Sequence, residues 1–181
     1  NAWRLIGRGL QSYPSESMDD TYIHFLTTGG TIDKEYRTRR GTRNFTVGPP
    51  AVERIFDTIA PEPTFEYTVE TVLRKDSLDA DADNRARVAA ACREAPGERV
   101  VITHGTDTMT ETAAALDGEK TVVLTGAATP QRMVDSDAAV NVGMAIGAVQ
   151  SLEPGVYIAM SGGVYPHDAV AKGDDGQFVP D

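Results

Sequence analysis

Short runs of apolar residues alternate with helical patterns along most of this chain, and this alternation limits the folds that the chain can adopt. Some of the runs are almost continuously apolar, which is typical of strands buried on both faces of a sheet. These runs cover residues 21–27, 99–103, 120–125 and 156–160. A further segment, 65–73, alternates apolar and polar residues and is rich in β-branched and aromatic side chains, so it is also predicted to be a strand.

Helices are predicted between these strands, at residues 50–59, 79–95, 108–116 and 135–150. The first of them repeats apolar residues at Val52, Ile55, Phe56 and Ile59, which is the spacing of one helix face. Strands that alternate with helices form parallel sheets with right-handed crossovers. We therefore expect an α/β fold of three layers, with a doubly wound, mainly parallel sheet and helices on both faces.

Three other segments lack such a pattern. Residues 33–48 are polar and rich in Arg and Gly, so they are expected to form a long irregular loop. Residues 161–181 are polar and Gly-rich, and this tail is expected to fray. Residues 1–18 precede the regular pattern and are expected to be an N-terminal extension, which leaves 19–181 as a single domain.

The charge of the chain excludes some classes of partner. Its 181 residues include 17 Lys and Arg against 27 Asp and Glu, a formal net charge of −10. We expect no nucleic acid as partner, because phosphate contacts need clustered cations. We also expect no membrane, because no apolar run approaches the roughly 18 residues of a membrane span. A cytoplasmic protein is the default expectation.

Polar turns that contain glycine or hydroxyl residues follow several of the predicted strands, where a doubly wound sheet binds its ligands. These turns are residues 27–32, 74–77 and 103–108. The first places the Thr31 hydroxyl beside a glycine pair. A hydroxyl needs a nearby base or cation to act as a nucleophile, and Lys75, Asp107 or a tyrosine are candidates. Backbone N–H groups at Gly30 and Gly105 are candidates for an oxyanion hole.

Simpler interpretations exist for the same residues. Asp107 could cap a helix, and Thr108 and Glu111 have the spacing of a capping box, which predicts a structural role. The glycine turn could instead bind a nucleotide phosphate, although the chain has no G-x-G-x-x-G or Walker pattern. The histidines are too scattered to give a metal-ligand spacing, so no metal is expected.

Two of the turns together resemble the signatures of the bacterial-type asparaginase/glutaminase family. Residues 28–32 (TGGTI) resemble its first signature, and residues 103–113 (THGTDTMTETA) resemble its second. The resemblance covers the family's larger N-terminal domain, as in compact single-domain asparaginase-like proteins. It implies that Thr31 attacks a side-chain carboxamide to form an acyl-enzyme and that Thr106 is a second active-site hydroxyl. It also implies that Asp107 binds the substrate α-amino group and belongs to the proton relay.

Two substrate-contacting positions depart from the family pattern. The family's loop tyrosine aligns with Phe45, and Tyr36 in the same loop is the candidate replacement. The Ser-Gln pair that grips the substrate aligns with residues 74–75, an arginine and a lysine, which favour a more anionic substrate or one without a free amine. The candidate substrate-binding residues are Gly30, Arg74, Asp76, Ser77 and Gly105.

A third departure concerns the family's lysine, which partners the second threonine. It aligns near Gln150 and Ser151, where this chain has no lysine, so Lys75 is expected to supply the ammonium from another strand. The acidic residue that the family's C-terminal domain contributes to a neighbouring subunit has no counterpart here. The site would then be open on one side, which is consistent with pairing into a homodimer.

The sequence leaves three functions to compare. The leading hypothesis is an amidohydrolase, without a cofactor, that releases ammonia from L-asparagine or a related small carboxamide through a threonine acyl-enzyme. The second is a small amino-acid-binding or regulatory module that retains the pocket but has lost turnover. The third is a nucleotide-binding domain, which the acidic charge disfavours.

Overall fold

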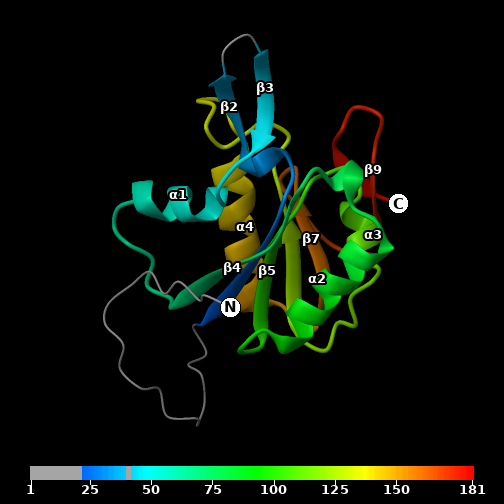
Figure 1. Ribbon diagram of the computed structural model, residues 1–181. Helices are drawn as coiled ribbons and strands as arrows, with labels where there is room; N and C mark the ends of the chain where they lie inside the picture. Colours follow the sequence, from blue (N-terminus) through cyan, green and yellow to red (C-terminus); the bar gives the residue numbers. More distant parts are fainter. Residues whose placement is uncertain (1–21, 40–41) are drawn as a thin grey trace.

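Six strands form the central sheet of the computed structural model, which describes residues 22–39 and 42–181 (Figure 1). The strand order is β4-β1-β5-β6-β7-β8. The strands are β1 (Ile23–Gly29), β4 (Tyr67–Lys75), β5 (Arg99–Thr103), β6 (Thr121–Thr125), β7 (Gly155–Met160) and β8 (Gly163–Pro166). Every neighbouring pair is parallel except β7 and β8, which are antiparallel. The predicted doubly wound, mainly parallel sheet is confirmed.

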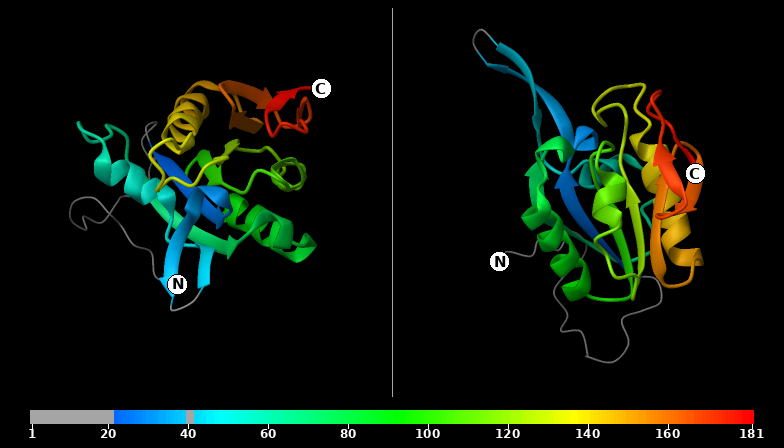
Figure 2. Two further views of the ribbon diagram at one scale, coloured as in Figure 1. Left: turned by 90° about the horizontal axis from the view of Figure 1, so that it is seen from above. Right: turned by 90° about the vertical axis from the view of Figure 1, so that its right-hand side faces the viewer.

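Helices cover both faces of this sheet (Figures 1 and 2). They are α1 (Ala51–Thr58), α2 (Ala82–Glu94), α3 (Met109–Ala113) and α4 (Ala138–Ser151). Strand residues alternate between two cores: Phe25 packs into the core with α1 and α4, whereas Leu26 packs into the core with α2 and α3. This alternation explains the nearly continuous apolar strands of the sequence, because both faces of each central strand are buried.

The strand order reverses around β1, and the reversal sets where a ligand can bind. The chain passes from β1 through α1 to β4 on one side, then through α2 to β5 on the other side of β1. The two crossover helices therefore leave the sheet on opposite faces. Such a switch point opens a crevice beyond the carboxyl ends of the two strands, which here are β1 and β5.

Residues 33–48 differ from the expected irregular loop. Most of them form an antiparallel hairpin of β2 (Lys34–Arg39) and β3 (Thr42–Val47), which projects beyond the carboxyl edge of the sheet (Figure 1). Tyr36 pairs with Phe45, and their rings meet edge to face with centroids 5.6 Å apart. The two aromatic side chains in this pair are exposed, so the sequence carries little apolar signal for the hairpin.

The C-terminal segment also differs from the expected fraying tail. After β8 it forms a second hairpin of β9 (Val170–Lys172) and β10 (Phe178–Pro180). Val170 and Phe178 are buried in the core beside α2 and α3, and they anchor both strands to the domain. Gly176, at φ 84°, allows the tight turn between them.

Residues 1–18, the expected N-terminal extension, lie outside the described residues. Within the described ranges, no helix is both long enough and apolar enough to cross a lipid bilayer.

Candidate active site

The turn after β1 packs against the turn after β5, backbone to backbone. Gly29 and Gly30 have φ angles of 99° and 81°, which favour glycine. A Cβ atom on Gly30 would lie 2.4 Å from the Cα of Gly105, so no side chain fits between the two turns. Thr31 follows directly and begins a 3-10 helix, η1 (Thr31–Asp33), with its side chain half-buried. The two predicted signature turns thus meet at the switch point.

The turn after β4 completes the junction. The Gly30 N–H donates to the carbonyl of Lys75 (2.8 Å), so this N–H is engaged and does not serve the expected oxyanion hole. Ser77 is buried, and a Cβ on Gly105 would lie 2.5 Å from its Oγ. Thr108 donates through Oγ1 to the Ser77 carbonyl (2.9 Å) instead of closing the expected capping box on its own helix. Three strand-end turns therefore interlock.

His104 stabilises the turn after β5 from inside the protein. Its Nδ1 lies 2.7 Å from the Gly105 carbonyl oxygen and its Nε2 lies 2.9 Å from the Thr112 hydroxyl. Since a carbonyl only accepts, Nδ1 carries the proton and Nε2 accepts from Thr112. Burial lowers the pKa of His104, which favours this neutral form. The histidine thus fixes the position of Gly105.

Thr106 and Asp107 share one ammonium group, that of Lys172 on β9. The Lys172 Nζ donates to Thr106 Oγ1 (2.9 Å) and to Asp107 Oδ1 (2.6 Å). The Asp107 side chain is 45% exposed and that of Lys172 is 26% exposed, so solvent and small molecules reach the pair. A lysine from the C-terminal hairpin therefore stands beside the second threonine.

Lys75, the residue expected to supply this ammonium, has a different partner. Its Nζ donates to Asn84 Oδ1 (2.8 Å) on α2. Lys75 ends β4, on the side of the sheet that α2 covers, and the described structure brings Lys172 rather than Lys75 to Thr106 and Asp107. Gln150 and Ser151, with which the family's lysine was aligned, lie at the end of α4 on the opposite face of the sheet.

Asp76 and Ser77 lie at the junction, but Asp76 is already paired. A 3-10 helix, η2 (Ser77–Asp79), follows Asp76, whose Oδ1 accepts from the Leu78 N–H (3.3 Å). Its Oδ2 lies 2.6 Å from the Nζ of Lys34, and this hydrogen bond lowers the pKa of Asp76. Arg74 precedes the turn with an exposed side chain.

Tyr36, the candidate replacement for the family's loop tyrosine, is on the projecting hairpin. It is 48% exposed, and its described ring contact is with Phe45. In the part of the chain that the structure describes, no hydrogen bond joins its hydroxyl to Thr31. The position expected to assist the nucleophile is therefore not docked against it.

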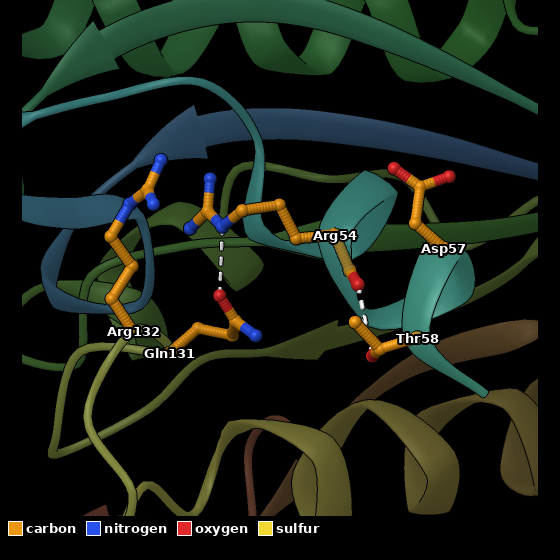
Figure 3. A pocket seen from close by; sticks show the side chains of 5 residues that line it. All are labelled: Arg54, Asp57, Thr58, Gln131 and Arg132. Atoms are coloured by element: carbon orange, nitrogen blue, oxygen red, sulfur yellow. Dashed lines mark hydrogen bonds between the residues drawn. The ribbon is translucent and has the colours of Figure 1, made fainter.

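A shallow hollow of about 400 Å³ lies beside α1 (Figure 3). It is lined by Arg54, Asp57, Thr58, Gln131 and Arg132. The Arg54 guanidinium points to the Gln131 amide, with an Nε–Oε1 distance of 2.8 Å (Figure 3). Arg132 pairs with Glu35 (3.0 Å) at the base of the hairpin. None of the predicted site residues lines this hollow.

No group of three or more His, Cys, Asp or Glu suited to a metal ion occurs within residues 22–39 and 42–181. The candidate site lies at the carboxyl edge of the sheet. Its members are two threonines, Thr31 and Thr106, and two ion pairs, Lys34–Asp76 and Lys172–Asp107. This fold and site define a class: doubly wound α/β proteins in which the turn of a strand-end threonine contacts the turn of a Thr-Asp-Lys cluster.

A comparison with known protein families identifies the family of the chain. Residues 22–178 match the family model described as the N-terminal domain of asparaginase. The chain therefore belongs to the asparaginase family and corresponds to that domain.

Individual relatives agree with this assignment. Over 156 residues the chain is 32% identical to a subunit of glutamyl-tRNA(Gln) amidotransferase from Methanococcus vannielii, covering 77% of this chain and 34% of that protein. Over 160 residues it is 27% identical to L-asparaginase 2 of Bacillus subtilis, covering 81% of this chain and 42% of that protein. The chain thus spans about a third to two fifths of these relatives.

Solved structures show the same correspondence. The thermostable L-asparaginase from Thermococcus kodakarensis aligns with a TM-score of 0.75 and 26% identity, covering 88% of this chain and 51% of that one. A probable cytoplasmic L-asparaginase from Campylobacter jejuni aligns with a TM-score of 0.72 and 27% identity, covering 88% and 53%. The present chain matches about half of each.

Proposed function

We propose that this protein is an amidohydrolase that releases ammonia from L-asparagine or a related small carboxamide through an acyl-enzyme on Thr31. The observation that carries the proposal is the cluster of Thr106, Asp107 and Lys172 at the turn whose Gly105 contacts Gly30, next to Thr31. Family membership and relatives named L-asparaginase support it.

The proposed reaction uses Thr31 and the members of this cluster in distinct ways. The Thr31 Oγ forms a bond to the carboxamide carbon while its proton passes to the site, and the amide nitrogen leaves as ammonia after protonation. Water then hydrolyses the Thr31 ester to give the free acid and restore the hydroxyl. Lys172 donates to Thr106 Oγ1, which leaves the Thr106 hydroxyl proton available for transfer. Asp107, which accepts a hydrogen bond from the same ammonium, binds the substrate amine.

The name of the Methanococcus vannielii relative is compatible with this chemistry. A subunit of glutamyl-tRNA(Gln) amidotransferase belongs, by its name, to an enzyme that transfers an amide group. Because the present chain covers only 34% of that protein, we propose for it the shared ammonia-releasing step alone.

A screen for ammonia release tests the proposal. Purified protein is incubated with L-asparagine, L-glutamine, β-aspartyl amides and N-acylated amides, with Thr31→Ala as the matched variant. We expect ammonia from at least one amide and a loss of roughly 1,000-fold or more in Thr31→Ala. Equal rates from both proteins would exclude Thr31 as the nucleophile, and no ammonia from any amide would exclude the proposed function.

The second candidate is a binding module that has lost turnover. It is favoured by the packing of Tyr36 against Phe45 on the projecting hairpin, which leaves the nucleophile without its expected tyrosine. In that case L-aspartate or L-asparagine raises the melting temperature of the protein without being consumed. Pairing into a homodimer and a cytoplasmic location stay predictions.

A further inference from the structure

The hollow beside α1 brings two guanidinium groups side by side (Figure 3). Arg54 lies on α1, and Arg132 lies on the loop between β6 and α4. Burial lowers the pKa of Arg54, and the positive charge of Arg132 lowers it further. The nearby carboxyl groups of Asp33, Glu35 and Glu53 act in the opposite direction but do not cancel this effect. The surroundings of Arg54 therefore leave room for a further negative charge.

The Arg54 guanidinium has a donor group without an acceptor. Its Nε donates to Gln131 Oε1 (2.8 Å), and its Nη1 donates to the Pro49 carbonyl (2.9 Å). Its Nη2 is buried, and among the described residues no group accepts a hydrogen bond from it. Buried donors without an acceptor cost free energy and are rare in folded proteins. An acceptor that comes from outside the chain would remove this cost.

Arg132 forms the accessible side of the pair. Its Nη2 lies 3.0 Å from Glu35 Oε2, and its side chain is 47% exposed. A guanidinium has five N–H donors in a planar fork that matches the oxygens of a carboxylate or a phosphate, and the printed ion pair engages one of its nitrogens. Exposed side chains change rotamer within nanoseconds. Arg132 can therefore turn outward and admit a ligand to the buried nitrogen of Arg54.

The rest of the lining restricts what can bind. Of the five lining side chains two are cationic and one, that of Asp57, is anionic. Asp57 lies at the opposite end of the hollow from the two guanidinium groups (Figure 3). A negative group therefore fits at the guanidinium end, and the volume of about 400 Å³ limits it to a small molecule or a terminal group. Because the net charge of the chain is −10, its long-range field repels anions, so binding depends on these short contacts.

We propose that this hollow binds a small oxyanion, a carboxylate or a phosphate group, between Arg54 and Arg132. One oxygen of the ligand accepts from Arg54 Nη2, and another accepts from the fork of Arg132. Gln131 is a positioning residue, because its oxygen holds the Arg54 guanidinium in place. The site is distinct from the one proposed for amide hydrolysis, since neither Thr31 nor the Lys172 cluster lines the hollow.

Anion titrations followed by nuclear magnetic resonance test the inference. Protein labelled with ¹⁵N is titrated with sodium phosphate and, separately, with sodium acetate, at constant pH and at an ionic strength kept constant with sodium chloride. We expect saturable shifts of the Arg54 Nε–H signal and of the Gln131 side-chain amide signals with at least one of the two anions. The anion that binds more tightly identifies the ligand group as a phosphate or a carboxylate.

Two arginine variants with the same change of charge show where the anion binds. Arg132→Gln removes an exposed guanidinium and leaves the buried contacts of Arg54 in place. We expect it to weaken binding roughly tenfold or more, because a hydrogen bond between charged groups is lost. Arg93→Gln is the matched control, since Arg93 is 54% exposed and lies outside the hollow, 3.9 Å from Asp117. Its affinity for the anion is expected to equal that of wild type.

Several results would overturn the inference. They are the absence of saturation with both anions, shifts confined to residues outside the hollow, and equal affinity in wild type and Arg132→Gln. An equal loss of affinity in Arg93→Gln would reveal a general effect of net charge and would overturn it as well. These measurements need no catalytic turnover, so failure of the proposed amide hydrolysis would leave their outcome unchanged.

Discussion

Lys172 is the residue of the candidate site that was not predicted from the sequence. It lies 65 residues after Asp107, inside a polar, Gly-rich segment, and its three-residue strand is too short to give an apolar pattern. The signal that could have found it is the pair of buried anchors around it, Val170 and Phe178. Thr31, Thr106 and Asp107 could be predicted because each lies within four residues of a strand end, in a turn that resembles a family signature. A residue that a distant hairpin brings to the site could not be predicted in this way.

Replacement of Lys172 provides a prediction at this scale. In Lys172→Met the carboxylate of Asp107 loses its ammonium and the Thr106 oxygen loses a donor. We expect kcat to fall roughly 100-fold or more, since a positioned charge beside reacting groups is lost. Lys75→Met, which removes only the contact with Asn84, is expected to have a far smaller effect on kcat. Steady-state ammonia release from the two variants measures the difference, and the reverse order would return the catalytic ammonium to Lys75.

The buried carboxyl group of Asp33 makes the stability of the protein depend on pH. Burial raises the pKa of its carboxyl group to about 7, although its Oδ1 accepts from the Ala51 N–H at the start of α1 (2.6 Å). Its folded pKa thus exceeds its unfolded value near 3.8. The stability from this group is fully present below the unfolded pKa and is lost as pH rises through about 7.

The variant Asp33→Asn separates this effect from others, because an amide keeps an oxygen acceptor for Ala51 but does not ionise. We expect the free energy of unfolding of wild type to fall by a few kcal/mol relative to the variant between about pH 4 and pH 8. Burial lowers the pKa values of His24 and His104, so their stabilisation is lost as pH falls below 6.5, equally in both proteins. Urea unfolding at several pH values gives the difference, and a constant difference would contradict a raised pKa at Asp33.

At the scale of elements, the predicted strands and helices of the central sheet agree with the structure because burial on both faces leaves continuous apolar runs. The two hairpins could not be predicted in the same way. β2 and β3 pair mainly with each other, and β9 and β10 contribute a few buried side chains from very short strands. Their polar residues therefore resemble those of an irregular loop.

The contact between the turns after β4 and β5 makes a steric prediction. A methyl group at Gly105 would meet Ser77 Oγ at 2.5 Å, whereas one at Gly147 on α4 has no heavy atom within 4 Å. We expect Gly105→Ala to lower the free energy of unfolding by about 1–3 kcal/mol through overpacking and to reduce ammonia release. Gly147→Ala is expected to raise it by about 0.5–1 kcal/mol as a helix substitution. Urea unfolding of both variants checks this, and an unperturbed Gly105→Ala would contradict close packing of the turns.

For the whole molecule, the topology explains why the candidate site forms where it does. The strand order reverses at β1, so the turns after β1, β4 and β5 gather at one edge although they are far apart in sequence. The C-terminal hairpin then brings Lys172 to the same edge after the chain has crossed the sheet. The fold thus concentrates the hydroxyl, carboxylate and ammonium groups of the candidate site at its switch point.

The central claim is that Thr31 forms a covalent ester with the acyl group of an amide, and peptide mass spectrometry tests it most directly. The protein is mixed with L-asparagine, quenched with acid within milliseconds and digested. The mass of the peptide that contains Thr31 is then measured. We predict that a fraction of this peptide gains the mass of an aspartyl group, and that Thr31→Ala gains none. An adduct on another residue, or ammonia release from a protein whose Thr31 peptide never changes mass, would contradict the claim.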